Sequence, residues 1–414
     1  MAKISYSRQT IEHDDIAAIV DSVNSGWLTQ GFHVETFEEA IKEYCGSKYA
    51  VVCCNGTAAL HLAYLALGIG KDDAIITSPI TFAATSNAAL YVEARPYFSD
   101  IDPDTRNIDP SKISNFKLQI ANCKAIVPVH FAGLPCDMEA IENIAKKNNL
   151  LIIEDACHAL GAGWVDKNNK LQKVGNCSHS DATVFSFHPV KSITTGEGGA
   201  ITTNNKNLYE RLKMLRSHGI TKEPEKFINK DLAFATHDPC LKPTGAGPRP
   251  TTLDPNQWYY EMHELGFNYR LTDIQCALGI SQLKKLDRFT KRRHEIASMY
   301  DKLLKDHPHI KLPVCKEGVY SAHHLYSVEI SFDKIGIARN EFFKSMAKKD
   351  IHLQVHYIPV HLQPYYQKRF GFKNNDFPAA EAYYKRAVSL PIYPLLTDKD
   401  VHYIVECMIN ELKV

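Results

Sequence analysis

The chain has 414 residues, of which 44% are hydrophobic and 23% are charged, and both values are ordinary for a globular protein. Its formal net charge of +1 excludes a global field that would attract nucleic acid or an anionic membrane. The sequence has no apolar run of membrane-spanning length and no apolar signal region near its N-terminus. The 11 scattered cysteines contain no CxxC pair, so we expect reduced thiols in a cytoplasmic protein, without a disulfide framework or a metal site.

Short apolar runs alternate with stretches of helical spacing through the first two thirds of the chain. Strands are predicted at Tyr49–Cys54 and in the later runs AIITS, AIVPVH, LLIIED, ATVFSF and GAITT. Helices are predicted at Thr57–Gly68 and in the run DMEAIENIAKKNN. This alternation predicts an α/β fold with a mostly parallel sheet, in which ligands bind beyond the carboxyl ends of the strands.

The pattern changes near residue 281. Residues 281–308 are charged and amphipathic and predict one long helix, and the strand and helix patterns that follow predict a small α+β domain. We therefore expect a large domain over residues 1–280 and a small C-terminal domain over residues 281–414. The polar stretch 221–264, rich in Pro and Gly, predicts a surface excursion of the large domain.

Lys191 and Asp155 are the first candidates for chemistry. Lys191 lies between the strand-like run ATVFSF and the glycine-rich TTGEGG, where it is either an exposed loop charge or an amine in a partly dry pocket. A lysine of the second kind can attack a carbonyl group. Asp155 ends the run LLIIED, where it either faces a ligand crevice or caps a following helix. Together they indicate pyridoxal phosphate, whose aldehyde binds lysine and whose pyridine nitrogen binds a carboxylate.

The run CCNGTAALH places Gly56, Thr57 and Ala58 where a predicted strand turns into a helix. Free N–H groups at a helix start suit a phosphate, although the same kind of turn is also a common packing device. Ser186 precedes Lys191 by five residues and could add a hydroxyl group to that phosphate.

Two further residues are open to two interpretations each. Phe82 follows the strand-like run AIITS and either stacks on a planar cofactor or packs in the core. His158 either contacts the oxygen of the cofactor ring or caps a helix turn. The histidines of IHLQVHYIPVH do not suggest a metal site, because the proline and the β-branched residues favour a strand and a loop.

The motifs EDACHA, FSFHPVKSITTGEGGA and GFNYRLTDIQCALG together resemble the DegT/DnrJ/EryC1/StrS sugar aminotransferases, which are fold-type I, pyridoxal phosphate-dependent enzymes. The likeness covers nearly the whole chain. It implies that Lys191 is the Schiff-base lysine and that Asp155 binds the pyridine nitrogen. It also implies that Phe82 lies over the ring and that the phosphate is bound by Gly56, Thr57, Ala58 and Ser186. Asn268 would reach the phosphate in the neighbouring subunit, so the resemblance implies a homodimer with shared active sites.

A narrower likeness links RQTIEHDDIAAIVDSVNSGWLTQG, TSPITFAATSNA, DPDTRNIDP and WYYEMHELGFNYRLTDIQ to the transaminases of pseudaminic acid biosynthesis within this family. It implies a UDP-4-keto-6-deoxy-N-acetylhexosamine as amino acceptor and L-glutamate as amino donor. The residues that it places in the nucleotide-sugar pocket are Tyr6, Gly26, Trp27, Leu28, Thr29, Asn55, His324, Leu325, Tyr326 and Ser327.

Other functions remain open at this point. One is an aminotransferase for a different nucleotide-linked keto sugar, such as one of the perosamine type, and another is a non-catalytic sugar or cofactor sensor. The family that the chain resembles also includes dehydratases, which have a histidine in place of the Schiff-base lysine. Lys191 therefore argues against a dehydratase. A phosphate-binding NTPase is disfavoured because the chain has no GxxxxGK[ST] stretch.

Overall fold

A central sheet of 7 strands runs in the order β1-β9-β8-β5-β4-β2-β3 in the computed structural model, which describes residues 3–116, 120, 122–233 and 258–412. The strands are β1 (Tyr49–Cys53), β2 (Ala74–Thr77), β3 (Arg95–Phe98), β4 (Cys123–Val127), β5 (Leu151–Asp155), β8 (Ala182–Ser186) and β9 (Gly199–Thr203). Every pair from β3 to β8 is parallel, and only β9 runs antiparallel to its neighbours. The mostly parallel α/β fold is therefore confirmed, and the carboxyl ends of six strands meet at one edge.

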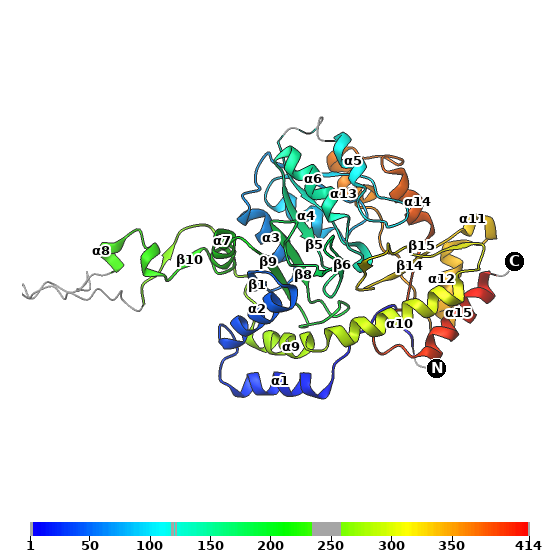
Figure 1. Cartoon of the computed structure of the whole chain (residues 1–414), viewed down its shortest axis with the longest axis horizontal. Coiled ribbons are helices and arrows are strands. Elements are labelled where there is room, and N and C mark those ends of the chain that lie inside the picture. Colours follow the sequence, from blue (N-terminus) through cyan, green and yellow to red (C-terminus); the bar gives the residue numbers. More distant parts are fainter. Residues whose placement is uncertain (1–2, 117–119, 121, 234–257, 413–414) are drawn as a thin grey trace, which may run out of the picture.

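Helices cover both faces of this sheet (Figure 1). They are α2 (Phe32–Cys45), α3 (Gly56–Ala66), α4 (Ala84–Tyr91), α5 (Pro110–Phe116), α6 (Met138–Asn148), α7 (Lys206–Arg216) and α9 (Asp273–Leu283). Helix α1 (His13–Asn24) packs on the outer side of α9. Side chains alternate along the strands: Val51 packs in the cluster that contains α3 and α7, whereas Ala50 and Val52 pack in the cluster that contains α2 and α9. Both faces of the sheet are thus buried, as a parallel sheet requires.

The predicted long helix over residues 281–308 is interrupted. Helix α9 ends at Leu283, and α10 (Leu286–Leu304) begins after a short turn. At this turn the Lys285 ammonium pairs with Asp14 at 2.6 Å and with Asp15 at 2.7 Å, both on α1. The interruption thus coincides with a site where α1 binds the junction between α9 and α10.

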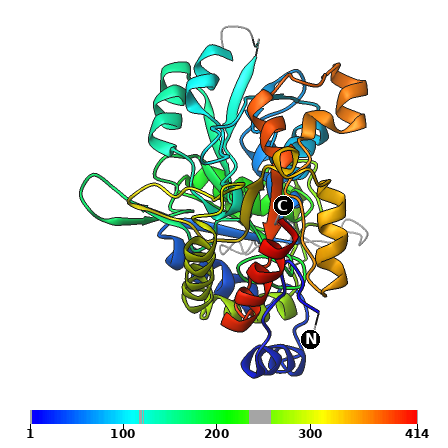
Figure 2. The ribbon, with the colours of Figure 1, turned by 90° about the vertical axis from the view of Figure 1, so that its right-hand side faces the viewer.

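A second core lies in the C-terminal part of the chain. It joins Ile4 to buried residues of the sheet β12 (Ile310–Lys311), β14 (Tyr326–Ile330) and β15 (Ala387–Leu390), and of helices α10, α12 (Arg339–Lys348) and α15 (Asp398–Leu412). Leu286 of α10 packs in the core of the large sheet, whereas Ile296 and Tyr300 of α10 pack in this second core. Figure 2 shows α15, in red, beside the N-terminal segment, in dark blue. The domain boundary at residue 280 stays a prediction.

The remaining elements are short. A three-stranded sheet joins β13 (Val319–Tyr320), β6 (Gly163–Val165) and β7 (Leu171–Lys173), and the last helices are α11 (Phe332–Ile335), α13 (Pro364–Phe370) and α14 (Pro378–Arg386). None of the helices in the described ranges is both long and apolar enough to cross a membrane.

The predicted excursion over residues 221–264 is described only at its two ends, because residues 234–257 lie outside the described residues. Strand β10 (Ile220–Thr221) pairs antiparallel with β11 (Glu261–Met262), and α8 (Lys230–Ala233) lies beyond them. Figure 1 shows β10 and α8 standing away from the body of the molecule. The surface excursion itself remains a prediction.

Candidate active site

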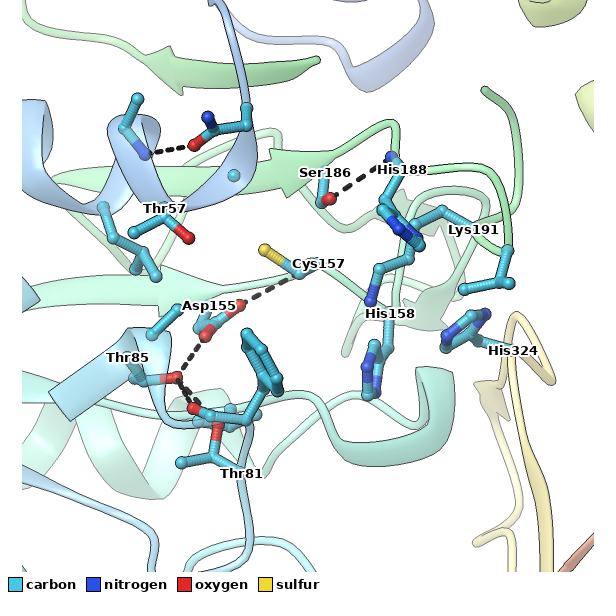
Figure 3. A pocket seen from close by; sticks show the side chains of 18 of the residues that line it. Thr57, Thr81, Thr85, Asp155, Cys157, His158, Ser186, His188, Lys191 and His324 are labelled. Carbon is cyan, nitrogen blue, oxygen red and sulfur yellow. Dashed lines mark hydrogen bonds between the residues drawn. The ribbon is translucent and has the colours of Figure 1, made fainter. Parts of the chain in front are cut away.

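A cavity of about 740 Å³ opens at the edge where the parallel strands end. Its walls come from the ends of β5 and β8, the first turn of α3, the segment before α4, and residues of the C-terminal part such as His324 and Tyr357 (Figure 3). The sheet edge thus brings residues that are far apart in the sequence to one place, as expected for an α/β fold.

Lys191 lies in the loop that joins β8 to β9, and its side chain reaches into this cavity (Figure 3). The loop is held by hydrogen bonds from the Lys191 N–H to the carbonyl of His188 at 2.9 Å and from the Thr195 N–H to the carbonyl of Phe187 at 3.0 Å. Burial lowers the pKa of the Lys191 amine, and the nearby Cys157 and Asp155 only partly oppose this shift. Lys191 is therefore not an exposed loop charge but a half-buried amine with weakened proton affinity.

Asp155 is the last residue of β5 and is only 5% exposed. Its backbone N–H donates to the carbonyl of Pro128 at 2.9 Å, which fixes the end of the strand. One carboxylate oxygen accepts the Thr85 hydroxyl at 2.6 Å, and the other accepts the Cys157 N–H at 3.2 Å. The carboxylate lines the cavity and also accepts an N–H of the turn that follows β5. No helix begins after Asp155, so the interpretation of this residue as a helix cap is wrong.

Gly56, Thr57 and Ala58 form the first turn of α3 and line the cavity together with Ser186. The Asn55 side chain caps the helix by accepting the Ala58 N–H at 2.8 Å. The N–H groups of Gly56 and Thr57 have no intrahelical acceptor, because they lie at the start of the helix. A Cβ atom on Gly56 would lie 2.9 Å from the Ser186 Cβ, so only glycine permits this approach of α3 to β8. The result is a set of donors suited to a phosphate group.

Aromatic side chains also line the cavity. Phe82 is 63% exposed, and its ring centre lies 6.3 Å from that of Tyr357, so the interpretation of Phe82 as a core residue is wrong. His158 is buried, and its Nε2 lies 3.0 Å from the Tyr357 hydroxyl. Burial and the nearby Lys191 lower the pKa of His158 well below its usual range, so this imidazole is neutral.

The chain matches the DegT/DnrJ/EryC1/StrS aminotransferase family over residues 9–409. The chain belongs to this family. The predicted resemblance is thereby confirmed, and the chain is a sugar aminotransferase whose cofactor is pyridoxal phosphate.

Among similar proteins, the UDP-4-amino-4,6-dideoxy-N-acetyl-beta-L-altrosamine transaminase of Campylobacter jejuni is 39% identical over 411 residues, which cover 99% of this chain and 98% of that protein. The structure of Helicobacter pylori PseC, an aminotransferase involved in the biosynthesis of pseudoaminic acid, matches with a TM-score of 0.85, 32% identity and 99% coverage of both chains. Spr1654 of Streptococcus pneumoniae in its pyridoxal phosphate form matches with a TM-score of 0.83, 27% identity and 100% coverage of both chains. These matches confirm the fold-type I architecture.

The cavity of this aminotransferase fits pyridoxal phosphate in size and in chemistry. An amine of lowered pKa and a buried carboxylate line the same space as the start of α3. The Nδ1 atom of the buried His158 has no hydrogen-bond partner in the described part of the chain, so a polar atom of a ligand can satisfy it. Histidine, cysteine, aspartate and glutamate side chains within the described ranges form no group that could bind a metal ion.

Of the residues predicted for the sugar pocket, Tyr6, Asn55 and His324 line the cavity. Gly26 to Thr29 lie in the loop between α1 and α2 and do not line it. In that loop the Leu28 carbonyl accepts the Asp273 N–H at 3.1 Å, and Trp27 is exposed. Asn268 forms a bridge with Ser217 and likewise does not line the cavity of its own chain.

Leu325, Tyr326 and Ser327 do not line the cavity, and the structure does not support the predicted role for them. All three are buried. The Tyr326 hydroxyl donates to Asp301 at 2.5 Å, and the Ser327 hydroxyl bonds the Tyr383 hydroxyl at 2.7 Å. Leu325 packs in the cluster that contains Phe131, and β14, which begins at Tyr326, packs in the second core. Of the four predicted residues from His324 to Ser327, His324 alone lines the cavity.

Sequence reasoning missed several residues of the site. Thr85, Cys157, His356, Tyr357 and Tyr269 all line the cavity but were not predicted. Thr85 lies in TSPITFAATSNA and Cys157 lies in EDACHA, and both motifs follow predicted strands. Their positions after strand ends could therefore have indicated that they line the site. His356 and Tyr357 lie in the run IHLQVHYIPVH, which was predicted to form a strand and a loop. The structure has a loop over residues 351–359, but the predicted strand is reduced to isolated bridges of Ile351 and Gln354. Only the contact between the two parts of the chain places His356 and Tyr357 beside Lys191.

Proposed function

We propose that this aminotransferase moves an amino group from L-glutamate to C4 of a UDP-4-keto-6-deoxy-N-acetylhexosamine, a step of pseudaminic acid biosynthesis. The observation that carries the proposal is the convergence of the Lys191 amine and the Asp155 carboxylate on one cavity. The choice of sugar is supported by the similarity to the Campylobacter jejuni transaminase and to PseC.

When bound, pyridoxal phosphate supplies an electron-accepting ring that stabilises the negative charge left on a carbon after its proton is removed. Asp155 would hold the protonated ring nitrogen by opposite charge, and Phe82 would cover the face of the ring. The start of α3 and Ser186 would bind the phosphate, and His158 would contact the ring oxygen. The buried position of Asp155 supports its role, because a charge pair is stronger away from water.

Lys191 would bind the aldehyde of the cofactor at rest and act as an acid and a base once the amino donor has released it. Its amine would take a proton from the α-carbon of glutamate and deliver it to C4′ of the cofactor. In the second half-reaction it would move a proton in the reverse direction, toward C4 of the sugar. The lowered pKa of Lys191 supports this role, because a larger fraction of the amine is neutral near pH 7.

We also propose that the enzyme is a cytoplasmic homodimer in which Asn268 reaches the phosphate site of the neighbouring subunit. The position of Asn268 outside its own cavity is consistent with that role. Large apolar side chains are exposed on the same molecule, among them Trp27, Leu28 and Phe32, and a subunit interface would cover such residues. Leaving Cys123 aside, the cysteines within the described ranges form no disulfide, which suits a reducing compartment.

A product assay tests the proposed substrates. Purified enzyme loaded with pyridoxal phosphate is supplied with glutamate and, in parallel, with UDP-, GDP- and dTDP-linked keto sugars, and amino sugar and 2-oxoglutarate are quantified. We expect the UDP-linked 4-keto-6-deoxy-N-acetyl sugar to give the highest kcat/KM. A preference for a GDP- or dTDP-linked sugar would overturn the proposed acceptor. Protein that binds the cofactor but shows no absorption change with glutamate would instead favour a non-catalytic binding role.

A further inference from the structure

The two oxygens of the Asp155 carboxylate have hydrogen-bond donors of different kinds. Oδ1 accepts a backbone N–H, that of Cys157, at 3.2 Å. Oδ2 accepts a side-chain hydroxyl, that of Thr85, at the shorter distance of 2.6 Å. A hydroxyl at this distance from a carboxylate forms a strong, charge-assisted hydrogen bond. The hydrogen bond from Thr85 is therefore the stronger of the two. Because its donor is a side chain, a single substitution of Thr85 can remove it.

The Thr85 hydroxyl is itself hydrogen-bonded to a second hydroxyl, that of Thr81. The Thr81 and Thr85 hydroxyl oxygens lie 2.7 Å apart, as the dashed lines in Figure 3 show. Thr85 has one hydroxyl proton, and an ionised carboxylate can only accept. If Thr85 donates to Asp155, Thr81 must donate to Thr85. The competing acceptor for the Thr85 proton, the carbonyl of Phe82, is farther away at 3.3 Å.

The three residues lie in a dry and rigid part of the molecule. Thr85 is 0%, Thr81 is 2% and Asp155 is 5% exposed. The Tyr64 hydroxyl of α3 donates to the Thr85 carbonyl at 2.8 Å and so fixes the first turn of α4. In such surroundings each hydrogen bond is stronger than in water, and each donor polarises the next.

We propose that Thr85, to which Thr81 donates, is a positioning residue that fixes the orientation of the Asp155 carboxylate, so that this carboxylate can bind the protonated ring nitrogen of the cofactor. The short hydrogen bond from Thr85 holds one carboxylate oxygen in place and so restricts the rotation of the carboxylate group. The inference rests on the proposed role of Asp155 and adds to it the residues that enable that role.

The test uses the whole enzyme loaded with pyridoxal phosphate labelled with ¹⁵N in the ring. The substitution Thr85→Val keeps the branched shape and removes the hydroxyl, whereas Thr85→Ser keeps the hydroxyl. Thr77→Val is a matched control, because Thr77 is equally buried and its hydroxyl donates to the Val127 carbonyl at 2.8 Å, not to Asp155. The two readouts are the ¹⁵N chemical shift of the bound ring and the Kd of the cofactor-free protein for pyridoxal phosphate.

We expect Thr85→Val to move the ¹⁵N shift toward that of neutral pyridine and to raise the Kd about tenfold, since a hydrogen bond to a charged group is lost. Thr85→Ser and Thr77→Val should keep the parent ¹⁵N shift. Thr81→Val should give a smaller change in the same direction, and it provides the test if Thr85→Val does not fold.

Two outcomes would overturn the proposal. One is a parent-like ¹⁵N shift in Thr85→Val and Thr81→Val, and the other is an equal change in Thr77→Val. Asp155→Asn separates this failure from a failure of the proposed function. If Asp155→Asn alters the ¹⁵N shift and Thr85→Val does not, only the role of Thr85 is wrong. If neither alters it, Asp155 does not hold the ring nitrogen.

Discussion

Lys191 and Asp155 influence each other through charge as well as through their shared cavity. Burial lowers the pKa of the Lys191 amine, and the negative charge of Asp155 is one of two influences that oppose the shift. Burial therefore favours the neutral form of the amine, whereas the Asp155 carboxylate favours its charged form. The proton affinity of the lysine thus depends on a carboxylate that lines the same cavity.

The first prediction concerns the pH dependence of cofactor capture. Only the neutral amine attacks the aldehyde, so the capture rate of cofactor-free enzyme should rise with pH and level off above the Lys191 pKa. That midpoint should lie below the usual value of 10.5. In Asp155→Asn the opposing negative charge is gone, so the midpoint should move to still lower pH. Stopped-flow absorption at saturating pyridoxal phosphate measures it.

Asp104→Asn serves as the control, because this exposed acid pairs with Lys311 far from the cavity, and the midpoint should stay at the parent value. A midpoint at or above 10.5 in the parent enzyme would show that Lys191 is more solvated than its burial implies. A rise of the midpoint in Asp155→Asn would contradict the coupling between the two residues.

At the scale of elements, the close approach of α3 to β8 brings the start of the helix beside the end of the strand that precedes Lys191. In Gly56→Ala the new Cβ would meet the Ser186 Cβ at 2.9 Å and the Cys157 Sγ at 3.3 Å. We expect the substitution to separate helix and strand and to cost about 1–3 kcal/mol of unfolding free energy. The Kd for pyridoxal phosphate should rise by about tenfold or more, since the donors to the phosphate move.

Gly70→Ala is the matched control, since its Cβ would meet no atom within 4 Å. Denaturant unfolding and fluorescence titration with the cofactor should give parent-like values for it. Equal cofactor affinity in Gly56→Ala and in the parent would show that this contact does not shape the phosphate site.

A buried polar network supports β5 on the side away from the cavity. Glu154 is 3% exposed, and its carboxylate lies 2.7 Å from the His130 Nε2 and accepts the Thr183 hydroxyl at 2.8 Å. The His130 backbone N–H in turn donates to the Asp155 carbonyl at 3.1 Å. Burial alone would raise the pKa of Glu154, but the hydrogen bonds from His130, Ser180 and Thr183 outweigh it and the net pKa is lowered.

Glu154→Gln should therefore destabilise the enzyme by about 3 kcal/mol near pH 7, because the buried donors His130, Ser180 and Thr183 lose a charged acceptor. A lowered pKa in the folded state means that the stabilisation is present above the usual value of 4.5 and is lost as the pH falls below it. The difference in unfolding free energy between parent and variant should shrink in that acidic range, which urea unfolding at several pH values measures.

Glu142→Gln is the control for this prediction. Glu142 also pairs with a histidine, His179, at 2.9 Å, but it is half-buried at the surface, so its loss should cost at most about 1 kcal/mol. Similar costs for the two substitutions would indicate that the Glu154 network is not specially stabilising.

At the scale of the whole molecule, mixed dimers can test whether each active site contains residues of both subunits. If Asn268 serves the neighbouring subunit, Lys191→Ala and Asn268→Ala dimers should each have little activity. A mixed dimer should contain one site in which both residues are native. Denaturing and refolding an equal mixture should then restore about a quarter of the parent activity by random pairing.

The control is each variant refolded alone, which should stay inactive. Size-exclusion chromatography before and after mixing verifies that dimers form. Recovery close to zero, with mixed dimers demonstrated, would place Asn268 and Lys191 in the same subunit's site and contradict the shared arrangement.

Several features followed from the sequence because the signals for them are local. Strand–helix alternation reflects the periodicity of side chains, and it predicted the mostly parallel sheet and the position of Lys191 and Asp155 at one edge. Family motifs predicted the aminotransferase and its cofactor. The residue types required by this chemistry, an amine and a carboxylate at strand ends, are visible without any knowledge of distances.

Other features were decided only by the tertiary structure. The hydroxyl chain from Thr81 through Thr85 to Asp155 depends on how α4 packs beside β5, and His356 and Tyr357 join the site because the C-terminal part closes over the sheet edge. The interruption before α10 and the burial of Leu325 to Ser327 depend on contacts between distant segments. Local patterns determine which elements form and which chemistry is available. Contacts between distant residues determine which side chains meet, because they depend on packing that no single stretch of sequence contains.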